Sequence, residues 1–226
     1  MSIEKIGLYK LLKILSAKEA LQISLVRSDL REERDKLLGN PSDPRDFYSP
    51  FWADAKAHVA GKCDLRIATQ ARIEDSDRRA NLYPRLRDGF LEWLELERRS
   101  TNYDLVPAEQ NFHTRFEFPD LHLLLKIDNV MGVKRYPSDI RLVYPYFCKE
   151  HALPQKWGRV GLWLMSKGFS QFDISEMEIL DVMRGRSFSG KIIALQGDEE
   201  TIFTRNFLEL RDMWLRLRPD YGLPLP

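Results

Sequence analysis

Residues 112–148 are the only long stretch of this chain that has the pattern of a β-sheet. Polar and apolar residues alternate over residues 114–118, and leucines or isoleucine then recur at every second position at the start of residues 121–130. Pro119-Asp120 lies between these two segments as a turn, which predicts a β-hairpin. Asp139 to Phe147 is rich in β-branched and aromatic residues, which favour a third strand.

Segments with the residue pattern of helices precede and follow this predicted sheet in the sequence. Apolar residues at helical spacing predict helices over residues 82–99, 154–168 and 198–218. Residues 177–182 predict a fourth strand, parallel to an earlier one because the preceding helix would be the crossover, and residues 187–195 predict a short edge strand. The expected fold class is α/β, in the broader sense of α+β: a mixed central sheet of about four to five strands flanked by helices.

The first 38 residues predict an amphipathic helical pair. Residues 3–15 have apolar side chains at mostly helical spacing, and Ser16 followed by Glu19 has the spacing of a capping box that would begin a second helix. Gly39 would end it. Such an apolar face either packs on its own domain or forms an interface with a second copy or a partner protein, and periodicity leaves both readings open.

The predicted domain organisation has four parts: an N-terminal helical region (1–39), a linker (40–50), one α/β domain (51–218) and a flexible tail (219–226). The linker assignment rests on three prolines among turn-forming residues. A length of 226 residues suits one domain with an appendage better than two domains.

Charge and composition exclude several classes of protein. The chain has 35 basic and 34 acidic residues, a balance that argues against a dominant polyanion-binding surface but allows a local basic stripe. Its two cysteines are too few for a disulfide scaffold. No stretch has the roughly 18 or more apolar residues of a membrane span, and lysines interrupt the apolar N-terminus, unlike a signal peptide. We therefore expect a cytoplasmic protein with no membrane association.

The phrase Ile127-Asp128-Asn129-Val130 falls in the second predicted strand. Together with the order of elements over residues 82–218, it resembles the core of the PD-(D/E)XK nuclease superfamily, particularly its RecB-like and Cas4-like branch. That branch has an acidic residue on the second strand and an acidic-x-Lys triplet on the third. The resemblance implies that Asp128 is a metal ligand and that Mg²⁺ is the cofactor of any active form, because two-metal phosphodiester cleavage needs converging oxygen ligands. The chain also resembles bacterial proteins of similar length, which implies no mechanism.

The third predicted strand departs from this pattern. Tyr144 and Tyr146 stand where the acidic residue and the lysine are expected. Asp139-Ile140-Arg141, just upstream, is an acidic-x-basic triplet, but an arginine does not readily act as a base at neutral pH. The resemblance therefore implies a degenerate catalytic centre in a protein that binds DNA or RNA without cutting it.

Two other functions compete with this hypothesis. One is a structural or regulatory protein that acts through partner contacts of residues 1–38. The other is an active Mg²⁺-dependent nuclease, whose candidate catalytic residues are Asp128, Asp139 and Glu92 or Glu95. The alternative for Asp128 is an exposed strand-end carboxylate beside Lys126 or Lys134.

Basic residues cluster near the hairpin and after the fourth strand. The candidate nucleic-acid-binding residues are Lys126, Lys134, Arg135, Arg141, Arg184 and Arg186. With the tyrosines between them, they would bind phosphates and stack bases; the alternative is ordinary loop charges and core tyrosines.

Two His/Cys pairs, His58 with Cys63 and Cys148 with His151, have wider spacing than the repeated ligand pairs of structural zinc sites. We expect these thiols and imidazoles to pack separately.

Overall fold

The structure is a computed structural model that describes residues 3–40, 47–136 and 139–224; residues 135, 136 and 139 are described by their backbone alone. Within these ranges the strands form one seven-stranded mixed sheet. In chain order they are β1 (Lys5–Gly7), β2 (Val106–Pro107), β3 (Phe112–Phe118), β4 (Leu123–Tyr136), β5 (Asp139–Tyr146), β6 (Met177–Asp181) and β7 (Arg186–Ser189).

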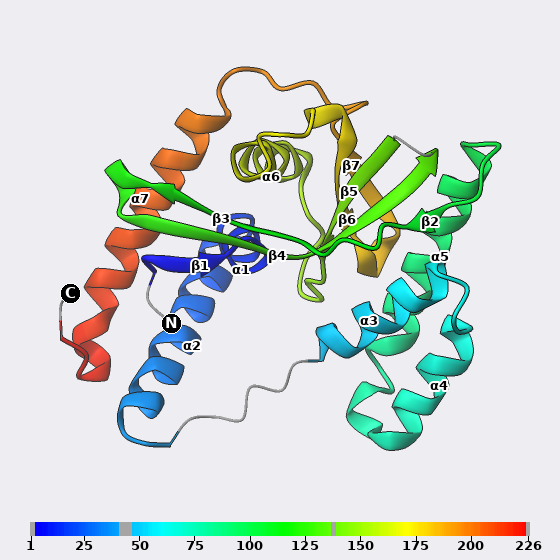
Figure 1. Ribbon diagram of the computed structural model, residues 1–226. Coiled ribbons are helices and arrows are strands. Elements are labelled where there is room, and N and C mark those ends of the chain that lie inside the picture. The colour runs from blue at the N-terminus through cyan, green and yellow to red at the C-terminus, as the bar shows by residue number, and fades with distance from the viewer. Residues whose placement is uncertain (1–2, 41–46, 137–138, 225–226) are drawn as a thin grey trace.

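Helices lie on both faces of this sheet, which confirms the predicted fold class (Figure 1). They are α1 (Leu8–Leu15), α2 (Glu19–Leu37), α3 (Tyr48–Val59), α4 (Leu65–Asp75), α5 (Tyr83–Arg99), α6 (Gln155–Gly168) and α7 (Glu199–Leu217). Short 3₁₀ turns are η1 (Asp77–Arg79), η2 (Pro119–Leu121), η3 (Ile174–Glu176), η4 (Val182–Arg184) and η5 (Arg218–Tyr221). No helix in the described ranges is both long and apolar enough to span a membrane.

Strand β4 connects the two halves of the sheet. Its first half lies between β3, which is antiparallel to it, and β1, which is parallel. Its second half pairs with β2 and β5, and β6 continues the sheet parallel to β5 because α6 provides the crossover. This parallel crossover confirms the prediction. The sheet has more strands than predicted because the very short β1 and β2 fall in segments expected to be helix and loop.

Two hydrophobic cores cover the two faces of the sheet. One contains apolar side chains of α1, α2, α6 and α7, and the other those of α3, α4 and α5. On α6, Gly158 and Gly161 lie against Phe188 and Ile179, so closely that a Cβ on either glycine would overlap the neighbouring side chain. The helix therefore packs directly on β6 and β7.

The N-terminal helical region belongs to the first of these cores. Leu8, Leu11, Leu12, Ile14 and Leu15 are all buried in it, so the protein itself covers this apolar face. The predicted helix over residues 3–15 is wrong at its start, because backbone pairing with β4 makes residues 5–7 a strand. The apolar side chains of α1 are therefore covered within the single chain.

The predicted capping box at the start of α2 is also wrong. Lys18 occupies the N-cap position without a side-chain hydrogen bond. Ser16 instead follows the end of α1, where its Oγ donates to the carbonyl of Leu12 at 2.6 Å.

The predicted linker and tail differ in outcome. Residues 41–46 of the linker lie outside the described residues, while Tyr48 already belongs to α3. The tail folds back on the molecule, because Leu223 is buried and Arg218 donates a hydrogen bond of 2.7 Å to the carbonyl of Pro224. Residues 225–226 are outside the described part of the chain.

Candidate functional site

Strand β4 bends at Asp128 and Asn129. Asn129 has a left-handed backbone conformation with φ of 65°, and the register with β3 shifts beside it. Before the bend, Leu125 and Ile127 face the core that contains α1; after it, Met131 faces the core that contains α3. A bulge of this kind redirects side chains, and bulges are over-represented next to active sites. The bend is therefore a candidate position for a functional site.

Helix α3 holds this bend in place. The indole Nε1 of Trp52 donates to the carbonyl of Asn129 at 2.7 Å, and one turn further along, the Lys56 ammonium contacts the carbonyl of Val130 at 3.4 Å. Trp52 is buried, so its hydrogen bond is shielded from water. The backbone at Asn129 thus has an external partner that stabilises its uncommon conformation.

Asp128 lines a small pocket with a volume of about 160 Å³. Its lining residues are Tyr9, Tyr48, Ser49, Trp52, Asp128, Asn129, Tyr144, Pro145 and Phe147. The Asp128 side chain is 46% exposed and lies 3.5 Å from the Arg115 guanidinium. Asp128 is thus an exposed carboxylate beside a cation, but that cation is on β3 and is neither of the lysines named from the sequence.

Aromatic rings form most of the pocket wall. Tyr48 stacks on Phe147 with ring centroids 4.9 Å apart and an angle of 10° between the planes. The hydroxyl of Tyr144 accepts a hydrogen bond of 2.7 Å from the backbone N–H of Tyr9, in the first turn of α1. Burial raises the pKa of Tyr144 far above neutrality. The position where the nuclease pattern has an acid therefore holds a neutral phenol that binds a helix N-terminus.

The three candidate catalytic residues do not meet. Asp139 pairs with Tyr136 at the far end of the β4–β5 ladder, more than roughly 20 Å along the strand from Asp128 at about 3.3 Å per residue. Glu92 is exposed on α5 and lies against the turn at Gly185. Within the described ranges, no group of three His, Cys, Asp or Glu residues is arranged to hold a metal ion. The backbone ladder therefore keeps Asp128 and Asp139 apart and does not bring them to one magnesium site.

The six candidate nucleic-acid-binding residues do not form one surface either. The Arg141 side chain is only 10% exposed and forms an ion pair of 2.9 Å with the buried Glu178. It is held inside the protein, so its assignment as a phosphate ligand is wrong. The side chain of Arg135 lies outside the described residues.

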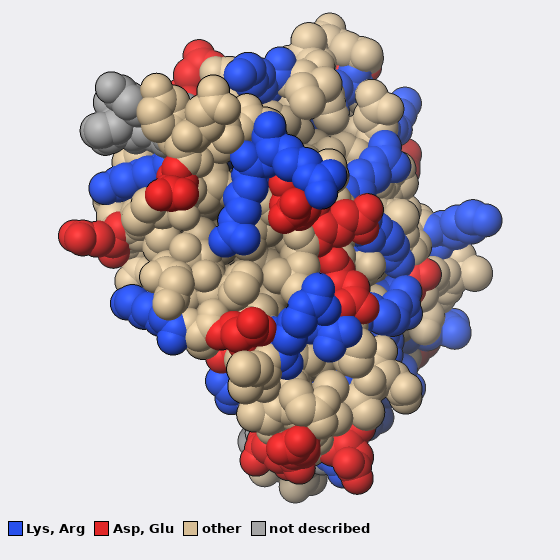
Figure 2. Space-filling view, turned by 90° about the vertical axis from the view of Figure 1, so that its right-hand side faces the viewer, with Lys and Arg blue, Asp and Glu red and all other residues tan. Residues whose placement is uncertain are grey.

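The four remaining candidates are on separate parts of the sheet. Lys126 pairs in register with Arg115, whereas Lys134 lies at the β2 end of β4. Arg184 forms an ion pair with Asp181, and the exposed Arg186 lies over the ring of Phe188. Figure 2 shows the face that lies on the right in Figure 1. Acidic and basic side chains are interleaved over it, as the near-equal numbers of basic and acidic residues suggested.

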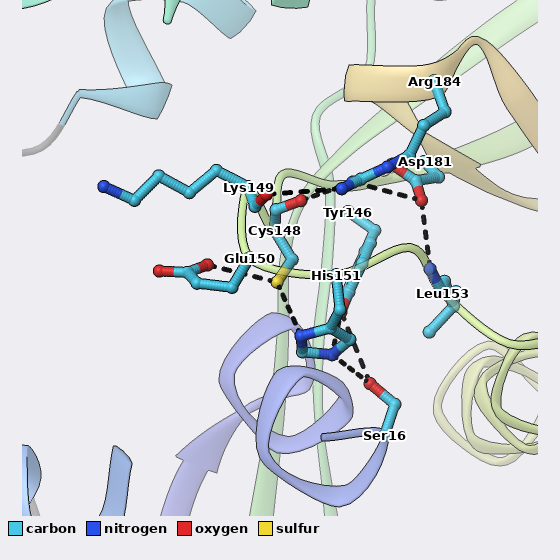
Figure 3. Close-up of polar contacts among 9 residues, drawn as sticks. All are labelled: Ser16, Tyr146, Cys148, Lys149, Glu150, His151, Leu153, Asp181 and Arg184. Atoms are coloured by element: carbon cyan, nitrogen blue, oxygen red, sulfur yellow. Dashed lines mark hydrogen bonds and ion pairs between the residues drawn. The ribbon is translucent and has the colours of Figure 1, made fainter. Parts of the chain in front are cut away.

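A polar cluster at the end of β5 was missed by the sequence analysis (Figure 3). His151 Nε2 lies 2.8 Å from Ser16 Oγ and 3.1 Å from the Tyr146 hydroxyl, and its Nδ1 lies 3.4 Å from Cys148 Sγ. The expectation that Cys148 and His151 pack separately is therefore wrong. The sequence signal for this contact was the three-residue spacing of Cys148 and His151 directly after a strand. Ser16 comes from the end of α1, so no local spacing indicated its part in the cluster.

This cluster has the geometry of a structural contact. Because Ser16 Oγ donates to the Leu12 carbonyl, it accepts from Nε2–H of His151, which leaves Nδ1 without a proton beside Cys148 Sγ; the Cys148 thiol donates to Glu150 Oε2 at 3.3 Å. Burial raises the pKa of Cys148 and lowers the pKa of His151. Both groups are therefore neutral at pH 7, whereas a thiol nucleophile would need the thiolate.

We expect His151 to make the stability of the protein depend on pH. Burial lowers the folded-state pKa of His151, so below about pH 6.5 the unfolded chain takes up a proton that the folded protein resists. The free energy of unfolding should therefore fall as the pH drops through this region. Urea denaturation at several pH values should show a shallower fall for His151→Gln than for the wild type.

Other charged groups surround the His151 imidazole. Glu150, Lys13, Arg184 and Asp181 all influence the charge on His151. They remain in place in His151→Gln, so the difference between the two slopes reports the imidazole alone. Equal slopes in the two proteins would contradict this assignment.

Comparison with known proteins adds no relative to this picture. No protein-family model matches the chain, and no curated protein matches it at a significant level.

Proposed function

We propose that this chain is a nuclease-like, catalytically degenerate protein that binds nucleic acid at the bend of β4. The position of Asp128 carries the proposal: an exposed carboxylate on the second strand of the meander, open to a pocket with aromatic walls. The order α5, β3, β4, β5, α6, β6 supports it, since this is the order that the resemblance implies. Binding DNA or RNA is then the function, and cleavage is not.

The donor set around Asp128 argues against cutting. Two-metal cleavage of a phosphodiester needs several oxygen ligands around the ions. Tyr144 and Tyr146 are neutral phenols, because burial raises the pKa of each well above neutrality. Asp128 is the one carboxylate among the described residues that line its pocket. It therefore lacks the companion ligands of a magnesium site.

The sheet beside the pocket supplies groups that suit a single strand. His113, Arg115 and Glu117 of β3 are exposed on the side opposite the core, and Arg115 lies in register with Lys126. Two cations that contact phosphates, next to aromatic rings that stack on bases, are the usual means of binding single-stranded nucleic acid.

Fluorescence anisotropy with labelled single-stranded DNA tests the proposal. Arg115→Met combined with Lys126→Met should weaken binding and lower the slope of log affinity against log salt by about 1.4, for two lost phosphate contacts. Asp128→Asn should bind at least as tightly as the wild type, because it removes a negative charge near the phosphates. The matched control, Arg31→Met with Lys36→Met, removes two exposed cations from α2 and should leave the slope unchanged.

The same assay tests the aromatic pocket beside Asp128 with a separate variant. Tyr48→Ala should weaken binding by about 1–3 kcal/mol, the value of one stacked base, whereas Tyr103→Ala, at an exposed position, should have no effect. Absence of binding at micromolar protein would refute the proposal. Labelled DNA and RNA should also stay intact in Mg²⁺ or Mn²⁺; a product that disappears in Asp128→Asn would show an active nuclease instead.

A further inference from the structure

A larger hollow, of about 660 Å³, lies beside the second half of α3. Its other walls are residues 106–111, between α5 and β3, and residues 130–132 of β4. This volume falls in the range of about 300–1,000 Å³ that is usual for pockets that bind small organic molecules. None of the residues named from the sequence as candidates for a site lines it.

Lys56 is the residue of this hollow that favours a negatively charged ligand. The ammonium contacts the carbonyl of Val130 at 3.4 Å, and no carboxylate of the described residues forms an ion pair with it. Burial lowers the pKa of Lys56, and no acidic neighbour opposes that effect. The site therefore contains a partly buried cation whose charge the protein does not compensate.

A bound anion would supply the missing compensation. A buried charge is costly until an opposite charge and hydrogen bonds satisfy it, so a carboxylate or phosphate beside Lys56 would gain more than the same group beside an exposed lysine. Lys62, exposed at the rim, adds a second positive charge on the path to it. Glu109 is exposed and is the one acidic residue among those that line the hollow.

The rest of the wall favours an apolar ligand body. Val59, Val106, Pro107 and Met131 line the hollow, and Val106 is 51% exposed, so its side chain is accessible to a ligand there. We infer that this hollow binds a small organic anion whose carboxylate or phosphate group contacts Lys56 and whose apolar part lies against Val59, Val106 and Met131. The residues that line this hollow are not those that line the Asp128 pocket, so the two proposals are tested with different variants and probes.

Isothermal titration calorimetry of the full chain tests the site with four probes: hexanoate, hexyl phosphate, hexanol and inorganic phosphate. Hexanoate or hexyl phosphate should bind, and the tighter of the two identifies the head group. Hexanol and inorganic phosphate should each bind more weakly, because each lacks one half of the recognised chemistry. Equal affinity for hexanol and both anions would overturn the inference, as would no heat from any probe at millimolar concentration.

Variants of Lys56 and Val106 test where the ligand binds. Lys56→Met should weaken binding of the better probe by about tenfold to a hundredfold, the loss expected for a hydrogen bond to a charged group, while Lys56→Arg should retain much of it. Lys36→Met, at an exposed lysine of α2, should bind as the wild type does. Val106→Glu leaves Lys56 in place but adds a negative charge to the wall, and it should also abolish binding. Unchanged binding in folded Lys56→Met or Val106→Glu protein would refute the site.

Discussion

Replacing Arg141 by methionine is expected to lower the free energy of unfolding by about 3–5 kcal/mol, the usual cost of removing one partner of a buried ion pair. Glu178 is fully buried, and its carboxylate contacts Arg141 at 2.9 Å and the indole N–H of Trp93 at 2.7 Å. The second acid at this arginine, Glu97, is more distant at 3.4 Å. Without the guanidinium, Glu178 would keep its hydrogen bonds with Trp93 and Ser187 but would have no cation beside it.

Urea denaturation followed by circular dichroism at pH 7 measures this loss. The control is the double variant Arg141→Met, Glu178→Met, which removes both charges and should recover most of the lost stability, because apolar side chains of similar volume can replace a buried pair. Burial raises the pKa of Glu178, so the single variant should lose less stability as the pH falls and this carboxyl takes up a proton. A single variant as stable as the wild type, or a double variant no better than the single, would contradict the assignment.

Arg141 also shows what a charge pattern leaves undecided. In the sequence it stands between Lys134, Arg135 and two tyrosines, which suggested a phosphate-binding surface. In the structure its guanidinium lies between α5 and the sheet, because Glu97 and Glu178 come to the same place from distant parts of the chain. Exposure, which separates a ligand-binding arginine from a buried one, depends on those distant residues.

Elements with a strong local period were predictable to within a few residues. The helix expected over residues 82–99 is α5 at Tyr83–Arg99, and the one expected over residues 154–168 is α6 at Gln155–Gly168. The three-residue β1 was missed because its pairing with Leu124–Lys126 defines it, and its own sequence carries no strand period.

In the candidate site, too, one residue was predictable from the local sequence and the others were not. Asp128 stands out in the sequence because its neighbours form a recognisable strand phrase. Tyr9, Tyr48 and Trp52 reach the same pocket only because α1 and α3 dock on the bend of β4, a long-range contact with no local signature. Asp139 was grouped with Asp128 because Asp139-Ile140-Arg141 is an acidic-x-basic triplet close to the expected motif position, but the antiparallel ladder places the two residues far apart.

Two leucines of the N-terminal region should respond very differently to truncation. Leu12→Ala is expected to lower the free energy of unfolding by about 2–5 kcal/mol, because its side chain is fully buried beside Gly161 of α6 and its loss leaves a cavity. Leu38→Ala should change it by no more than about 0.5 kcal/mol, since Leu38 is 67% exposed. Urea denaturation of both variants measures the difference.

This pair separates the two readings of residues 1–38. If their apolar face belongs to the protein's own core, stability should follow the burial of each leucine, and sedimentation velocity should show the same mass for folded Leu38→Ala and the wild type. If these residues instead joined two copies, Leu38→Ala would shift the protein toward a smaller species while Leu12→Ala left its unfolding unchanged. The complete burial of Leu12 against α6 makes the first result the expected one, because an interface residue would be exposed in a single chain.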